Sequence, residues 1–249
     1  AKVWSSLYQG LPVPEGQAVF SPELWPTYDE LPGGPYQEAL GTDLAYGARA
    51  RHDHSAHVAG RRYHADKRRI YVVEADDMAE AGELYACRLA EVQIRRAGGP
   101  RLVVPRRADD IETAWRRQLQ DLPLLSVRRI PCRWYTSTTE AGTAQLLRGY
   151  GAHVDAVRAA VDKLARVQAG GLASAAAEGR LLVPSRPSPG IARMMKAAKD
   201  FTGVEGDFDD PVDALCAMHD VLAVPVSRLG DLAVGRLLGE RAWGGERSA

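Results

Sequence analysis

Three short segments of the chain carry acidic side chains that could act together, although they lie far apart in the sequence. The first contains Asp43, the second Glu140, and the third Asp209, Asp210 and Asp213. Carboxylate oxygens are the ligands that Mg²⁺ and Mn²⁺ prefer, and two such ions roughly 4 Å apart can hold the attacking water and the leaving oxygen of a phosphodiester. If folding joins the three segments, they could hydrolyse a phosphodiester without a protein nucleophile.

Basic side chains gather in a separate stretch. Residues 49–69 hold seven Arg and Lys residues against two Asp residues, whereas the whole chain has 32 Lys and Arg against 32 Asp and Glu and a formal net charge of +0. The net charge therefore gives no argument for nucleic-acid binding. The segregation of charge is nevertheless what a metal site beside a phosphate-binding face requires, and the alternative is two solvated charged surfaces.

Two other patterns that can hold metals carry less weight. The three cysteines, Cys87, Cys132 and Cys216, are widely spaced and form neither a disulfide framework nor a CxxC motif. His52, His54 and His57 follow an HxHxxH pattern, but a path from loop to strand should point them apart. We therefore expect buried cysteines and no zinc site.

The acidic segments need elements that end at one place. Hydrophobic patterning predicts strands over residues 40–46, 55–63, 69–74, 132–136, 153–159 and 180–184. It predicts helices over residues 78–96, 109–119, 143–148 and 161–178, and a last helix in which Asp210 is the N-cap and Pro211 the first residue. This order predicts an α/β fold with a mixed central sheet flanked by helices, and places each acid at the end of an element.

The 249 residues can build one large domain. Residues 1–40 are rich in Pro, Gly and aromatic side chains, which predicts an extended linker; residues 41–235 form the domain, and 236–249 a flexible tail. No apolar run is long enough to cross a bilayer, so we expect no membrane partner.

Several motifs, taken in order, resemble the C-terminal nuclease domain of the large terminase subunit of tailed bacteriophages. The opening Leu7-Tyr8-Gln9 to Pro14-Glu15-Gly16 is similar to the segment that follows the ATPase domain of that family. The later motifs are Gly41-Thr42-Asp43-Leu44-Ala45, Glu140-Ala141-Gly142, Asp162-Lys163-Leu164-Ala165-Arg166, Glu178-Gly179-Arg180 and Asp209-Asp210-Pro211-Val212-Asp213. The resemblance covers nearly the whole chain. No Gly-x-x-x-x-Gly-Lys-Ser/Thr phosphate loop occurs, so we expect an isolated C-terminal piece whose ATPase domain is absent.

The resemblance implies an RNase H-like fold of the RuvC and integrase type and a DNA endonuclease of low sequence specificity. Such an enzyme would cut concatemeric viral DNA with two Mg²⁺ or Mn²⁺ ions during genome packaging in the cytoplasm of the host cell. Its partners would be double-stranded DNA, the ATPase domain, the portal and the small terminase. The implied catalytic residues are Asp43, Glu140 and Asp210, and the implied metal ligands add Asp209, Asp213 and Asp53.

The middle acid has an alternative in Asp109-Asp110, because the interval before Glu140 is long for the family. We favour Glu140, since a glycine, a helix and a valine-rich strand follow it in the expected order, whereas Asp109 has the place of a helix cap. The DNA-binding candidates are Arg49, Arg51, Arg61, Arg62, Lys163 and Arg166.

Two other functions remain open at this point. One is an ATPase of the sugar-kinase or actin type, whose first strand also carries Gly-x-Asp, but the glycine-rich phosphate loops it needs do not follow the predicted strands. The other is a non-catalytic module that docks on the portal or the small terminase. Metal-dependent cutting of plasmid DNA separates the nuclease from both.

Overall fold

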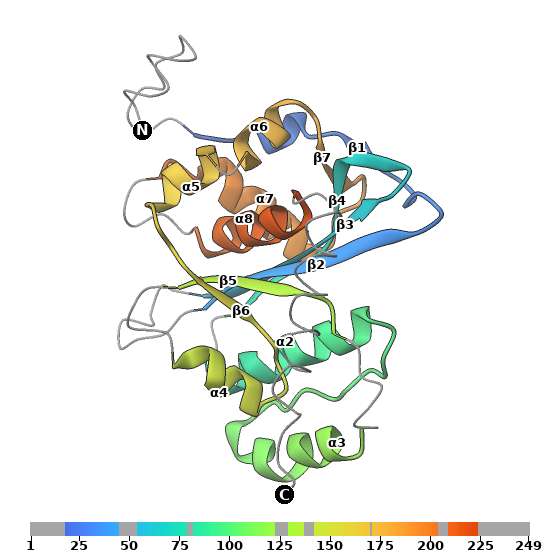
Figure 1. Cartoon of the computed structure of the whole chain (residues 1–249), viewed down its shortest axis with the longest axis vertical. Coiled ribbons are helices and arrows are strands. Elements are labelled where there is room, and N and C mark those ends of the chain that lie inside the picture. Colours follow the sequence, from blue (N-terminus) through green and yellow to red (C-terminus); the bar gives the residue numbers. More distant parts are fainter. Residues whose placement is uncertain are drawn as a thin grey trace, which may run out of the picture.

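The computed structural model describes residues 18–44, 54–78, 82–122, 129–136, 142–169, 171–203 and 209–223. Within these ranges the centre of the molecule is one mixed sheet with helices on both faces (Figure 1). Its strands are β1 (Thr27–Tyr28), β2 (Tyr36–Asp43), β3 (Ser55–Tyr63), β4 (Asp66–Met78), β5 (Cys132–Thr136), β6 (Asp155–Arg158) and β7 (Leu181–Pro184). Its helices are α2 (Glu83–Arg96), α3 (Arg116–Gln120), α4 (Thr143–Gly149), α5 (Lys163–Ala169), α6 (Leu172–Ala177), α7 (Pro189–Asp200) and α8 (Asp210–Ala223), with short helical turns at Pro22–Leu24, Ala108–Asp110 and Ile111–Trp115.

The strand order of the sheet is β1-β7-β4-β3-β2-β5-β6. Strands β2, β3 and β4 form an antiparallel meander, and β5 and β6 extend it in parallel on the other side of β2. The three antiparallel strands and the two parallel strands beside the first of them form the mixed sheet expected of an RNase H-like fold. The fold-class prediction is confirmed.

Helices α5, α6, α7 and α8 cover one face of the sheet, and α2, α3 and α4 cover the other (Figure 1). On the first face α8 lies against β2 and β3. Gly41 of β2 makes this contact possible, because a Cβ there would lie 1.9 Å from the carbonyl oxygen of Ala214 and 2.3 Å from the amide nitrogen of Met218. The missing side chain at Gly41 thus sets how closely α8 approaches the strand that ends in Asp43.

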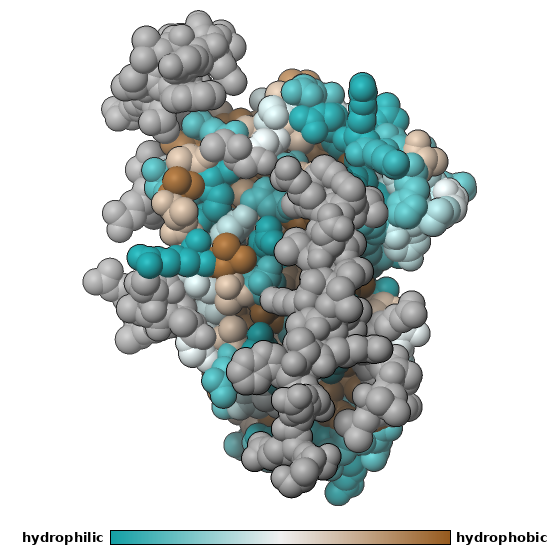
Figure 2. Space-filling view, in the orientation of Figure 1, coloured by the Kyte–Doolittle hydropathy of each residue, from teal (hydrophilic) through white to brown (hydrophobic). Residues whose placement is uncertain are grey.

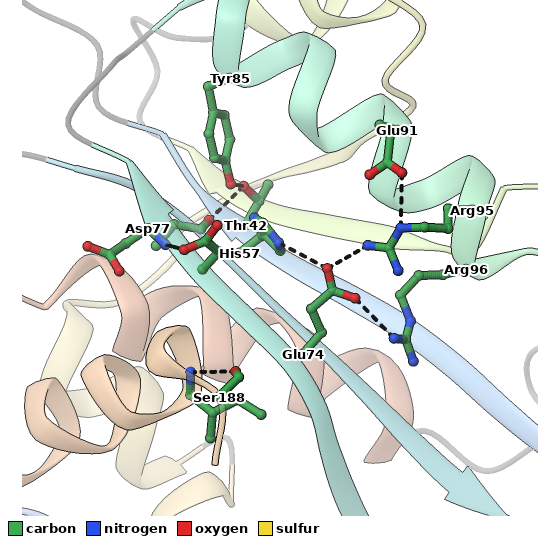
Figure 3. Close-up of polar contacts among 12 residues, drawn as sticks. Thr42, His57, Glu74, Asp77, Tyr85, Glu91, Arg95, Arg96 and Ser188 are labelled. Carbon is green, nitrogen blue, oxygen red and sulfur yellow. Dashed lines mark hydrogen bonds and ion pairs between the residues drawn. The ribbon is translucent and has the colours of Figure 1, made fainter. Parts of the chain in front are cut away.

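A network of charged side chains lies between the sheet and α2 (Figure 3). Glu74 of β4 pairs with Arg95 at 2.6 Å and with Arg96 at 3.0 Å, and its carboxylate is 4.0 Å from the ring of the buried His57. Arg96 also pairs with Glu38 of β2. Burial alone would raise the pKa of Glu74, but the nearby His57 ring and the hydrogen bond from Arg95 hold it far below its usual value. These pairs hold α2 on the meander.

We expect Glu74→Gln to lower the free energy of unfolding by about 2–3 kcal/mol, because it leaves two arginines under α2 without their shared carboxylate. A folded-state pKa below 4.5 means that the contribution of Glu74 is present above that pH and is lost on acidification. Urea unfolding at pH 7 and pH 4 measures both effects, and the difference between variant and wild type should shrink at pH 4. A constant difference at the two pH values would contradict this account.

Most elements match the prediction. Strand β3 and strand β5 have the expected bounds, and Gly179 follows α6 with a φ of +66°, as the predicted helix stop requires. The predicted helix over 161–178 is in fact two helices, α5 and α6, with Gly171 at a φ of +85° before the second. The predicted helix start at Met78 is wrong, since Met78 is the last residue of β4.

Helix α7 was not predicted, although its sequence has a common N-cap residue, a proline in the first turn and apolar residues at helical spacing. Ser188 caps it by accepting a bond from the amide of Ile191 at 3.3 Å, and Pro189 is its first residue. Ile191, Met194 and Ala198 follow at helical spacing and are buried.

Part of the predicted linker belongs to the folded domain. Phe20 and Trp25 are buried and pack edge to face, and Phe20 also lies beside Phe201. Strand β1 pairs with β7, and β2 begins at Tyr36 rather than at residue 40. Residues 1–17 and the predicted tail over 236–249 lie outside the described residues.

The three cysteines are buried, as expected. In the described ranges, no helix is long and apolar enough to cross a membrane. The coloured part of the face in Figure 2 is mostly hydrophilic, and its hydrophobic patches are small and separate.

Candidate active site

Strand ends and the start of α8 meet at one edge of the sheet. Asp43 is the last residue of β2, and α8, which packs on β2, begins at Asp210. Strand β5 runs parallel to β2, with Thr42 beside Trp134, so both strands end at the same edge. The structure therefore brings together two of the three predicted acidic segments and ends β5 beside them.

The acids surround two cations from α5. The ammonium Nζ of Lys163 is 2.7 Å from Asp209 Oδ1 and 2.7 Å from Asp213 Oδ2, and Arg166 Nη2 is 2.6 Å from Asp213 Oδ1. Both carboxylate oxygens of the buried Asp213 are thus held by cations of the same chain. We refer to Asp43, Asp209, Asp210 and Asp213 as the acid cluster.

Burial and repulsion among the acids raise the pKa of two carboxyl groups of the acid cluster. Burial and then the carboxylates of Asp213 and Asp210 raise the pKa of Asp43 well above its usual value, and the charge of Lys163 only partly opposes this. Burial also raises the pKa of Asp209. Burial would lower the pKa of Lys163, but Asp213, Asp43 and Asp209 together raise it above its usual range. In the part of the chain that the structure describes, the acid cluster therefore carries more negative charge than Lys163 and Arg166 balance.

A second set of polar side chains continues from the acid cluster along the same edge. The backbone amide of His54 donates to Asp210 Oδ2 at 2.9 Å, and the His54 ring is 3.0 Å from Asp77 Oδ2. Arg193 of α7 pairs with Asp77 and, at 2.7 Å, with Asp76. These contacts fix the orientation of Asp210. The sequence reading missed them, because it placed no helix at α7. His57, by contrast, lies buried beside Tyr85 of α2 on the other face of the sheet, so His54 and His57 point apart, while His52 lies outside the described residues.

The two candidates for the middle acid can be compared by position. Asp109 and Asp110 are exposed in the turn Ala108–Asp110, which leads into the α3 segment on the face opposite α8. Glu140 itself lies outside the described residues, as does Asp53. It follows β5, which ends at Thr136 at the edge that carries Asp43. The choice of Glu140 as the middle acid stays a prediction, whereas Asp109 and Asp110 lie on the face opposite α8.

The predicted DNA-binding residues fall into two described pairs. Arg61 pairs with Glu38 at 2.8 Å and lies over the ring of Tyr36, and Arg62 donates to Gln37 at 2.7 Å. Both lie five or more residues along β3 from Ala56, the partner of Asp43, which is about 17 Å of strand. The structure does not bring Arg61 and Arg62 to the acid cluster.

Lys163 and Arg166 do reach the acid cluster, but they bind its carboxylates, and Arg166 also lies over the Tyr135 ring at 4.5 Å. Arg49 and Arg51 lie outside the described residues.

The donors of the acid cluster suit a divalent cation in their chemistry. Its side chains offer carboxylate oxygens, and a hard cation would relieve the repulsion that raises the pKa of Asp43. Among the described residues, however, no three Asp, Glu, His or Cys side chains are arranged to close around one ion. Lys163 occupies the space between Asp209 and Asp213.

No family model and no curated protein matches the sequence. Among solved structures, the chain is similar to the large terminase nuclease from thermophilic phage G20c with bound zinc, at 12% identity and a TM-score of 0.48, with 81% of this chain and 96% of that chain covered. The same nuclease with bound magnesium gives 13% identity and a TM-score of 0.46, with 83% and 98% covered. The large terminase of bacteriophage HK97 gives 13% identity and a TM-score of 0.44, with 82% of this chain and 43% of that chain covered.

Proposed function

We propose that this chain is a metal-dependent DNA endonuclease that cuts concatemeric viral DNA during genome packaging, with low sequence specificity. The observation that carries the proposal is the meeting of Asp43 with Asp209, Asp210 and Asp213 at one sheet edge. The order of the motifs along the sequence supports it independently. Its partners would be double-stranded DNA and, in the longer protein, the ATPase domain, the portal and the small terminase, in the cytoplasm of the host cell.

Asp43, Glu140 and Asp210 would hold two Mg²⁺ or Mn²⁺ ions, with Asp209 and Asp53 as further candidates. Bound ions would supply an activated water and stabilise the leaving oxygen. Four described residues position the acids of the cluster. Gly41 lets α8 approach β2, the amide of His54 orients Asp210, and Lys163 and Arg166 hold Asp213.

We expect the purified protein to nick and linearise supercoiled plasmid in Mn²⁺ or Mg²⁺ and to leave it intact in chelator, because no side chain of the site replaces the ions as activator of water. Gel electrophoresis of plasmid digests measures this. Glu140→Gln should abolish cutting, whereas the matched double variant Asp109→Asn, Asp110→Asn should cut like wild type, since those two acids lie on the other face. Cutting in chelator, or an active Glu140→Gln, would contradict the proposal.

A further inference from the structure

Lys163 offsets part of the negative charge of the acid cluster. Among the described residues, the four carboxylates face the cations of Lys163 and Arg166, and Lys163 bridges Asp209 and Asp213 while its charge also acts on Asp43. Its side chain is largely sheltered from solvent, with 28% of its surface exposed, so its attraction to the acids is only partly screened. The ammonium offsets the negative charge of Asp209 and Asp213, as a bound metal cation would.

Asp213 differs from the other three acids. It is the most buried of them, and its two oxygens are held by Lys163 and Arg166 at 2.7 and 2.6 Å. Arg166 is itself fixed between Asp213 and the Tyr135 ring of β5. The pairing therefore ties α5 to the first turn of α8 and to β5. Asp213 serves as the anchor of this arrangement, which leaves Asp43, Asp209 and Asp210 for metal.

We propose that Lys163 is a tethered counter-ion of the acid cluster, which holds the site together without metal and which divalent metal must displace from Asp209. The inference rests on the proposed function, because it concerns the same metal site, and it assigns Lys163 a role in metal loading rather than in DNA binding. Asp43 and Asp209 would hold the ion, whose charge would repel the ammonium. Lys163 would keep its bond to Asp213 and lose the one to Asp209.

Two consequences follow for Lys163→Met, which keeps the length of the side chain but removes its charge. In chelator the variant should melt at a lower temperature than wild type, because the repulsion among the acids is then unopposed at Asp209. In calorimetric titration it should bind Mn²⁺ at about tenfold lower concentration, because the competing charge is gone. Lys163→Arg keeps the charge and should restore the behaviour of wild type in both measurements.

The matched control is Lys196→Met on the exposed side of α7, which should change neither value. A direct observation needs no variant: in ¹⁵N NMR the ammonium protons of Lys163 should exchange slowly with solvent in chelator, and they should exchange faster when Mg²⁺ saturates the protein, because the bond to Asp209 is then lost while that to Asp213 remains. This measurement decides the matter if Lys163→Met does not fold.

Unchanged melting in chelator, or Mn²⁺ affinity that is equal to or weaker than that of wild type, would overturn the role of Lys163. If the proteins still cut plasmid DNA with metal, the proposed function would stand without it. If Lys163→Met is less stable in chelator and binds Mn²⁺ more tightly but wild type cuts no DNA, the counter-ion role stands and the nuclease proposal fails. Absence of Mn²⁺ binding in both proteins would overturn both proposals.

Discussion

Replacing Asp43 by asparagine is expected to abolish DNA cutting and, in chelator, to raise the melting temperature of the protein. The two effects have one cause. Asp43 lies at the end of β2 among carboxylates that raise its pKa, so its charge is unfavourable in the folded protein without metal. Asparagine keeps the size of the side chain and the oxygen that accepts a bond from the amide of Leu44 at 3.0 Å, but carries no charge.

The direction of the stability change follows from the sign of the pKa shift. The folded-state pKa of Asp43 lies above the unfolded value of 3.8, so its favourable contribution is present below pH 3.8 and is lost as the pH rises through the folded-state pKa. At pH 7 this carboxyl group therefore lowers the stability of the metal-free protein relative to an uncharged side chain of the same size. Each kcal/mol recovered by Asp43→Asn should raise the melting temperature by about 2–4 °C.

Differential scanning calorimetry in chelator at pH 7 and the plasmid assay in Mn²⁺ test the two effects together. Asp121→Asn, at an exposed position after α3, is the control and should leave both unchanged. A variant that melts below wild type would mean that Asp43 is stabilised by its neighbours, contrary to the charge balance described above. A variant that cuts normally would remove Asp43 from the site.

Local sequence patterns sufficed to predict several of the elements around the acid cluster. The predicted bounds of strands β3 and β5 are the observed ones, whereas β2 begins four residues before its predicted start at residue 40. Asp210 at the start of α8 followed from Pro211 alone, because proline is favoured in the first turn of a helix. These signals are local and need no knowledge of tertiary contacts.

The partners of the cations could not be predicted in the same way. Arg61 and Arg62 belong to a basic stretch, but strand alternation and the register of β2 place them beside Glu38 and Gln37. Lys163 lies far from Asp209 in the sequence, and only the packing of α5 beside α8 joins them. Charge patterning along a chain identifies charged segments, whereas the choice of partner depends on contacts between distant elements.

Gly41→Ala is expected to lower the free energy of unfolding by about 3 kcal/mol and to reduce DNA cutting by about 10²-fold. The added methyl would lie 1.9 Å from the carbonyl oxygen of Ala214 and 2.3 Å from the amide nitrogen of Met218. Both atoms belong to the backbone of α8, which cannot move aside as a flexible side chain could. Helix α8 must therefore shift away from β2, and Asp210 and Asp213 shift with it relative to Asp43.

Denaturant unfolding and the plasmid assay measure the two losses. Gly33→Ala is the matched control, since a Cβ at Gly33 meets nothing within 4 Å, and it should leave both values near those of wild type. The substitution moves α8 but removes no carboxylate. Added Mn²⁺ should therefore not restore cutting by Gly41→Ala at any concentration that saturates wild type. Wild-type stability in this variant would show that α8 lies farther from β2 than the structure places it. The distances between Asp43 and the acids of α8 would then also be larger.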